Sequence, residues 1–205
     1  MSPKYDTTSL TLLGRVRLQE PEAWDRLVEL YAPLVRYWCQ RSDLGPEDTA
    51  DLFQEVFRAV SQNIEGFERD ASGGTFRGWL RTITANKIRD HFRRQAGKAA
   101  AQGGTDAQMH LQAVVDPLAE SDGEEDAAEQ NLVHESLHKA LGWIKDDFEE
   151  KTWTAFWQCQ VEEQPTDIIA QSLGMTPAAV RKAKYRVLRR LREELEGLIE
   201  GEQFN

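Results

Sequence analysis

Cysteine is scarce in this sequence, which has only Cys39 and Cys159 among 205 residues. The two are isolated and far apart, so a CxxC pair and a disulfide framework are excluded, as suits a reducing cytoplasm. Long apolar runs are also missing, because no stretch approaches about 18 uncharged apolar residues, and a membrane-spanning helix is not expected. The first six residues lack the apolar core of a signal peptide. We therefore expect a cytoplasmic protein that makes no contact with a membrane.

The motifs of common enzymes are nearly all absent. The chain has no GxxxxGK(S/T), GxGxxG or GxSxG motif, and no pair of carboxylates stands out as an acid–base dyad. The exception is His-Glu-Ser-Leu-His at residues 134–138, which has the H-E-x-x-H spacing of a zinc hydrolase. No third ligand follows His138, so we interpret the string as a coincidence and keep a zinc hydrolase as an alternative. We expect no enzyme activity, no cofactor and no metal.

Charge is distributed unevenly along the chain. The net charge is −10, but residues 98–130 alone hold eight acidic residues against one lysine. Two basic stripes interrupt the acidic average: residues 77–94 carry six basic side chains and one acidic, and residues 181–192 carry seven and none. Such local stripes, rather than the net charge, indicate where nucleic acid can bind.

The hydrophobic pattern is helical throughout, and no strand pattern is present. Apolar residues recur at steps of three and four, and a helix opening at Pro46 places a set of them on one face: Leu52, Phe53, Val56, Phe57, Val60 and Ile64. Few residues between 96 and 130 could anchor a core. The sequence therefore predicts an all-α fold of two small helical domains, residues 1–96 and 131–205, joined by a flexible acidic linker at residues 97–130.

Residues 166–192 have the layout of a helix-turn-helix. A short helix opens at Pro165, Gly174 can supply a left-handed turn, and Thr176 followed by Pro177 is typical of a helix start. Ala170 is small enough for close helix packing. Apolar side chains of the second helix would face inward (Val180, Val187, Leu188 and Leu191) and leave its basic side chains for solvent or DNA. Early residues of such a helix reach base edges, and later basic residues neutralise phosphates.

The other basic stripe, residues 76–94, combines aromatic and cationic side chains. Phe76 and Trp79 alternate with arginine and lysine, a combination that suits unstacked bases because every base offers a π-face. The plainer interpretation is that Trp79 belongs to the core and the basic residues are solvated.

Taken in order, these parts resemble bacterial RNA polymerase sigma factors of the extracytoplasmic-function (ECF) class of the sigma-70 family. Asp-Thr-Ala-Asp-Leu-Phe-Gln-Glu-Val-Phe at residues 48–57 is similar to region 2.2, and residues 76–94 are similar to regions 2.3 and 2.4. Ile-Ala-Gln-Ser-Leu-Gly-Met-Thr-Pro-Ala-Ala-Val-Arg at residues 169–181 is similar to region 4.2. Ile168 departs from the glutamate often found there, at a position we interpret as structural.

The resemblance implies a transcription initiation factor that binds core RNA polymerase, recognises the −35 and −10 promoter elements and helps melt the −10 region. Polymerase would be bound through the clamp helices of its largest subunit by Asp48, Asp51, Leu52, Gln54, Glu55 and Arg58. The flap of its second-largest subunit is a further expected contact. Contacts to −10 DNA would come from Arg77, Trp79, Asn86, Lys87, Arg89, Asp90, Arg93 and Arg94, and a loop around residues 63–75 would capture an unstacked base. Contacts to −35 DNA would come from Thr176, Pro177, Arg181, Lys182, Lys184, Tyr185, Arg186 and Arg189.

Two further points stay open at the level of sequence. A free-standing helix-turn-helix repressor or activator is the main alternative, although it leaves residues 48–58 and the Trp79 stripe without a role. Members of this class are often held by an anti-sigma factor, so such a partner is also to be tested.

Overall fold

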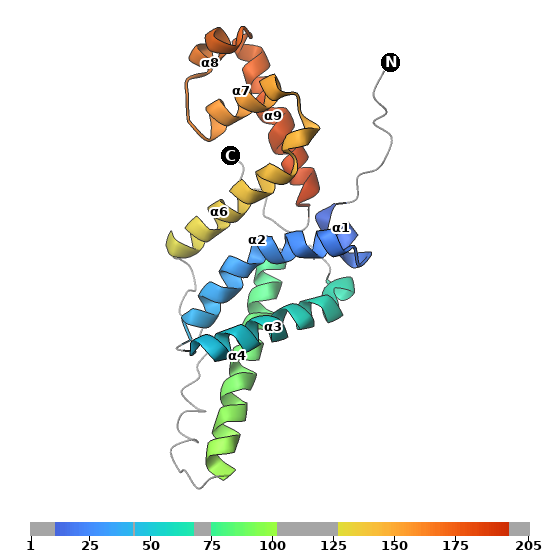
Figure 1. The fold of residues 1–205 in the computed structure, drawn as a ribbon, viewed down its shortest axis with the longest axis vertical. Coiled ribbons are helices and arrows are strands. Elements are labelled where there is room, and N and C mark those ends of the chain that lie inside the picture. Colours follow the sequence, from blue (N-terminus) through green and yellow to red (C-terminus); the bar gives the residue numbers. More distant parts are fainter. Residues whose placement is uncertain (1–10, 43, 68–74, 102–126, 197–205) are drawn as a thin grey trace. The chain divides into compact units, whose positions relative to one another are not determined.

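The computed structural model describes residues 11–42, 44–67, 75–101 and 127–196, and every regular element within these residues is helical (Figure 1). The first part of the chain forms α1 (Leu12–Arg17), α2 (Pro21–Gln40), α3 (Pro46–Asn63), the 3-10 turn η1 (Ile64–Gly66) and α4 (Phe76–Ala101). The second part forms α6 (Ala127–Trp143), the 3-10 turn η3 (Lys145–Asp147), α7 (Glu150–Gln160), α8 (Thr166–Leu173) and α9 (Pro177–Glu194). The all-α prediction is confirmed.

The chain divides into two compact units. The N-terminal unit comprises residues 16–136, and the C-terminal unit combines residues 137–205 with residues 1–15. The predicted linker at residues 97–130 lies mostly outside the described residues. At its edges the helices extend further than predicted, because α4 continues to Ala101 and α6 begins at Ala127.

The N-terminal unit is built on α2, α3 and α4, each of which contacts the other two. Pro21 and Pro46 begin α2 and α3, where a missing N–H costs no intrahelical hydrogen bond. The core between the helices is formed by fully or almost fully buried apolar side chains: Leu27, Leu34, Trp38, Leu52, Val56, Val60, Phe76, Leu80 and Ile88. Phe53, predicted on the apolar face, is only half-buried.

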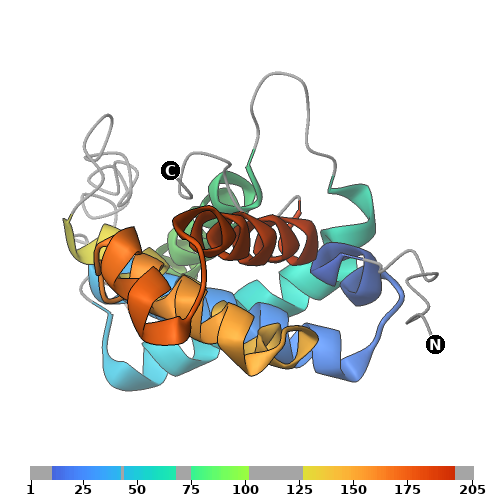
Figure 2. The same cartoon turned by 90° about the horizontal axis from the view of Figure 1, so that it is seen from above.

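In the C-terminal unit, α7, α8 and α9 lie side by side (Figures 1 and 2). Gly174 ends α8 with φ of 58°, in the left-handed region that glycine adopts without strain. Thr176 caps α9, its side-chain oxygen accepting a hydrogen bond of 3.2 Å from the Ala179 N–H. Both features were predicted from the sequence, and they confirm the local helix-turn-helix layout.

Small residues line the contact between the helices of the C-terminal unit. One buried cluster joins α7, α8 and α9 through Ala155, Ile169, Ala170, Val180 and Ala183. Three of the five are alanines, so little side-chain volume separates the backbones. The inward positions predicted for α9 are all buried. No helix among the described residues combines the length and apolar character needed to cross a bilayer.

Candidate nucleic-acid interface

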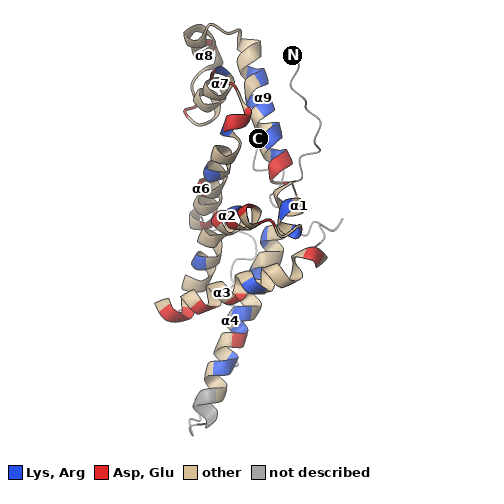
Figure 3. Ribbon diagram, turned by 45° about the vertical axis from the view of Figure 1, so that its right-hand side comes forward, with Lys and Arg blue, Asp and Glu red and all other residues tan. Residues whose placement is uncertain are grey.

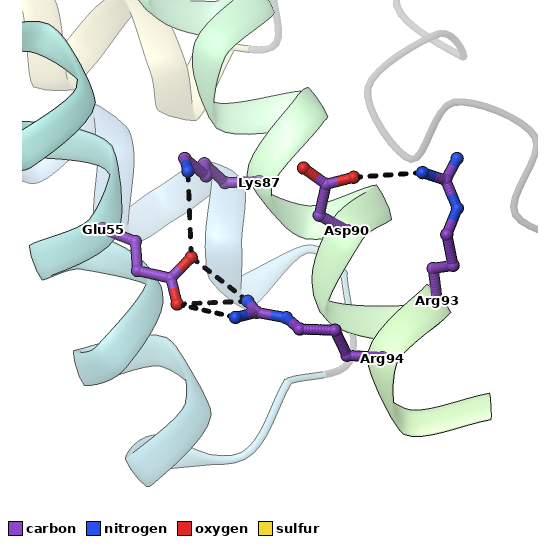
Figure 4. Close-up of polar contacts among 5 residues, drawn as sticks. All are labelled: Glu55, Lys87, Asp90, Arg93 and Arg94. Atoms are coloured by element: carbon purple, nitrogen blue, oxygen red, sulfur yellow. Dashed lines mark hydrogen bonds and ion pairs between the residues drawn. The ribbon is translucent and has the colours of Figure 1, made fainter. Parts of the chain in front are cut away.

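The predicted polymerase-binding helix and the predicted DNA-binding helix meet at Glu55 (Figure 4). Arg94 of α4 donates three hydrogen bonds of 3.1 Å to the Glu55 carboxylate on α3, through both of its terminal nitrogens. Lys87 Nζ lies 4.0 Å from the second Glu55 oxygen. Two residues assigned to DNA therefore share one carboxylate that was assigned to polymerase.

The electrostatics of this junction are those of a solvent-accessible ion pair. The Arg94 hydrogen bond and charge hold the pKa of the Glu55 carboxyl below its usual value, despite partial burial, and Glu55 in turn raises the pKa of Arg94. The Arg94 side chain is 55% exposed and that of Glu55 29%. Pairs of this kind contribute about 0.2–1 kcal/mol to stability, so the contact is well formed but weak.

A second link between α3 and α4 involves a histidine that was not predicted as a site residue. His91 Nε2 lies 3.7 Å from Asp48 Oδ1. These two residues, together with Asp51, Glu55 and Arg94, line a small open hollow of about 220 Å³ between the helices. The partners are far apart in sequence, so no local motif could have indicated the pairing.

Further along α4, the exposed side chains are available to a ligand. Asn86, Arg89 and Arg93 are exposed, and Arg93 pairs with Asp90 at 3.3 Å on its own helix. This pair is also drawn in Figure 4. Four of the predicted −10 contacts, Asn86, Arg89, Asp90 and Arg93, therefore lie at the surface of α4.

Two predicted −10 contacts at the start of α4 are less accessible. Arg77 is only 15% exposed and pairs with Glu129 of the same unit at 3.1 Å, so its predicted contact with DNA is not supported. Trp79 is half-buried and packs against Phe67 and Phe76, with ring centroids 5.1 and 5.4 Å away. One part of its indole therefore belongs to the core and the remainder faces outward. The rest of the predicted base-capturing loop, residues 68–74, lies outside the described residues.

Of the polymerase contacts predicted on α3, one lies in the core and others lie at the surface. Leu52 is 1% exposed and its side chain anchors α3 to the unit's core, so this burial does not support its predicted contact with polymerase. Asp51, Gln54 and Arg58 are exposed.

Gln54 and Arg58 also border an open apolar hollow of about 540 Å³ beside α3. Its apolar lining comes from Trp24, Phe53 and Phe57, whose rings contact one another edge-on or tilted. The sequence pattern indicated these residues only as core positions.

The C-terminal unit presents the second basic surface, along α9 (Figure 3). Five of the predicted −35 contacts are exposed there: Arg181, Lys182, Tyr185, Arg186 and Arg189. Lys184 and Pro177 are half-buried, and the Thr176 hydroxyl accepts a hydrogen bond as the helix cap. Tyr185 is 60% exposed, which places an aromatic ring among the cations.

Ile168 contradicts the structural role that we predicted for it. The side chain is 55% exposed on α8, whereas the adjacent Ile169 is fully buried. Consecutive residues of a helix point about 100° apart, and here Ile169 faces the core while Ile168 faces solvent.

The H-E-x-x-H string lies on α6, where His134 and His138 are both exposed. His138 packs edge-on against Trp157, with centroids 6.1 Å apart. Within the ranges that the structure describes, no group of three or more His, Cys, Asp or Glu side chains could hold a metal ion. The zinc alternative therefore has no third ligand there.

Comparison with known proteins finds a matching family, a curated relative and a solved structure. Residues 27–98 match the family Sigma-70 region 2, which covers α3 and nearly all of α4. The chain is 27% identical over 178 residues to the ECF RNA polymerase sigma factor SigE of Mycolicibacterium smegmatis, covering 84% of this chain and 62% of that protein. The chain thus spans about three fifths of the length of this relative. A solved structure of CnrH in complex with the cytosolic domain of CnrY is 18% identical and covers 90% of this chain and 95% of the other. Its TM-score of 0.36 is too low to support any argument.

Proposed function

We propose that this chain, which belongs to the ECF class of RNA polymerase sigma factors, acts as a promoter-specificity subunit of bacterial RNA polymerase. It would bind core polymerase, recognise −35 and −10 promoter elements and help to open the −10 region. Catalysis would remain with the polymerase. The observation that carries the proposal is the match of residues 27–98 to sigma-70 region 2, because that segment contains both α3 and the accessible cations of α4.

The polymerase contact would use the exposed face of α3. Asp51, Gln54 and Arg58 are free of core packing, and the aromatic hollow beside them offers apolar area of the kind that protein interfaces bury. Asp51 is the most informative of these residues, because it is the exposed acidic one, so a substitution there can reverse the charge of this face.

The DNA contacts would divide between the two units. In the N-terminal unit, α4 combines exposed cations with the outward part of Trp79, which supports binding of unstacked bases. In the C-terminal unit, the first exposed basic residues of α9 are Arg181 and Lys182, which suits reading of base edges in the major groove. Engaging two elements with two tethered units raises effective concentration for the second contact.

The decisive experiment mixes the purified full chain with bacterial core RNA polymerase and measures comigration and transcription from promoter DNA fragments. Stable comigration, with start sites that share upstream −35 and −10 elements, is the expected result. Specific binding to duplex DNA by the chain alone, without polymerase binding, would instead favour a conventional helix-turn-helix regulator. Binding to neither would contradict the proposal.

Variants locate the polymerase surface. Asp51→Arg should abolish comigration, because it reverses charge on an exposed position that no core contact requires. Glu29→Arg is the matched control, an equal charge reversal at an exposed position of α2 in the same unit. If both variants comigrate as the wild type does, α3 is not the polymerase surface.

A second set of variants locates the −35 contact. Arg181→Ala and Lys182→Ala should weaken −35 recognition and leave polymerase binding intact. Lys139→Ala, at an exposed position of α6, is the control. A bidentate base contact is worth about 1–3 kcal/mol, so a loss of roughly five- to 150-fold in promoter selectivity is expected from Arg181. An equal loss of polymerase binding would contradict the assignment.

A further inference from the structure

The ion pairs at Glu55 suggest a device that links the two activities proposed for the N-terminal unit. We propose that Glu55 neutralises Arg94 and Lys87 in the free protein, and that a partner bound to α3 releases these cations to DNA. The inference rests on the proposed function, because it requires α3 to bind polymerase and α4 to bind DNA.

The first step is the occupancy of the carboxylate. Oε1 accepts from both terminal nitrogens of Arg94, and Oε2 accepts from one of them while lying 4.0 Å from Lys87 Nζ. Both oxygens are therefore engaged by cations of α4 (Figure 4). A cation whose charge is already neutralised by a carboxylate releases fewer counterions when it meets a phosphate, so it adds less to DNA affinity.

The second step is that the contact is exchangeable. The Arg94 guanidinium is more than half exposed, and a phosphate offers it the same bidentate geometry as a carboxylate. The charged groups nearby are Arg58 on the side of Glu55 and Asp90 on the side of Arg94, while His91 faces Asp48. Both side chains of the pair are partly exposed, so a partner approaching α3 can compete for Glu55 directly.

The third step is the contrast with a neighbouring cation. Arg93 precedes Arg94 in the chain, but it pairs with Asp90 of its own helix. A partner on α3 has no direct route to that pair. The structure therefore assigns Arg94 and Lys87, and not Arg93, to the set of cations that respond to α3. The two binding events are thermodynamically linked, so DNA that binds Arg94 would in turn make Glu55 available to the partner on α3.

The test measures binding of the full chain to a short fluorescein-labelled single-stranded oligonucleotide of mixed sequence, by anisotropy at several salt concentrations. Glu55→Gln should bind about two- to fivefold more tightly than the wild type, because it removes a surface ion pair that competes with phosphate. The slope of log affinity against log salt should steepen by about 0.7 for each cation freed. Circular dichroism confirms that each variant is folded.

Two controls separate the pair from a general change of charge. Glu29→Gln removes one negative charge from an exposed position of α2 and should have a clearly smaller effect. In the Arg94→Gln background, Glu55→Gln should lose most of its effect, which a double-mutant cycle measures. A merely structural role of Glu55 would not change the salt slope.

The same binding measurement in the presence of polymerase tests whether a partner on α3 releases the two cations. With saturating core RNA polymerase, the wild type and Glu55→Gln should bind the oligonucleotide equally well, because the partner has already taken Glu55. If Glu55→Gln and Glu29→Gln have the same effect on the free chain, or if the difference between wild type and Glu55→Gln persists with polymerase bound, this inference is overturned while the proposed function stands. If the wild type binds neither polymerase nor DNA, both are overturned.

Discussion

Ile169 is the residue on which the helix-turn-helix should depend most strongly. Its side chain is fully buried between Ala155, Ala170, Val180 and Ala183. Truncation to alanine removes three carbons, which at roughly 0.8 kcal/mol each is a transfer cost of about 2.4 kcal/mol. The three alanines of the cluster have no side-chain length with which to fill the void, so only longer neighbours such as Val180 and the partly buried Leu173 and Met175 can move into it, and the remaining cavity adds to this cost. We expect Ile169→Ala to destabilise the C-terminal unit by about 3–4 kcal/mol.

Ile168→Ala is the matched control, since it makes the same chemical change one residue earlier on α8. Ile168 is 55% exposed, so its truncation should change the free energy of unfolding by no more than about 0.5 kcal/mol. Urea unfolding followed by circular dichroism gives the energies. Hydrogen exchange of peptides from residues 150–194 shows that the loss lies in this unit. Equal costs for the two variants, or a larger cost for Ile168→Ala, would refute the assignment of the buried face.

Two further predictions concern the turn and the buried thiol. Gly174→Ala should destabilise the C-terminal unit by about 1–2 kcal/mol in thermal melts. The reason is backbone strain alone, because φ is 58° there and nothing lies within 4 Å of an added Cβ. Gly142→Ala in α6, where an added Cβ also meets nothing within 4 Å, should be neutral or slightly stabilising in the same measurement. Burial raises the pKa of the Cys39 thiol to about 11. Iodoacetamide at pH 8 should therefore label half-buried Cys159 first and Cys39 only after urea unfolding, which mass spectrometry of the peptides measures. Rapid labelling of Cys39 in the native protein would contradict its placement in the core.

The local features of the fold could be predicted from the sequence. The starts of α3, α8 and α9, the left-handed turn at Gly174 and the cap at Thr176 each depend on residues within a few positions of one another. Such features follow from backbone sterics and from hydrogen bonds between residues that are close in the sequence. The inward face of α9 could also be predicted, because its buried residues recur at helical spacing.

The sequence did not indicate the direction of a side chain where one residue type is compatible with two environments. Leu52 lies in a stretch similar to a polymerase-binding motif, and yet its side chain packs into the core. Arg77 belongs to a basic stripe, but it is turned toward Glu129. Ile168 is apolar and sits beside a core residue, yet it faces solvent. In each case the motif indicates a segment of the chain, and the direction of one side chain was decided by packing against other helices.

The sequence by itself therefore determined that the chain is helical, where the helix-turn-helix begins and turns, and which stripes are basic. Those properties depend on neighbours along the chain. Only the tertiary structure decided that Glu55 pairs with Arg94, 39 residues later, and that Asp48 faces His91. The helical period specifies which residues share one face of a helix. Which face of α3 lies against which face of α4 depends on how the two helices cross over their common core. The link between the two proposed binding surfaces is a consequence of that crossing.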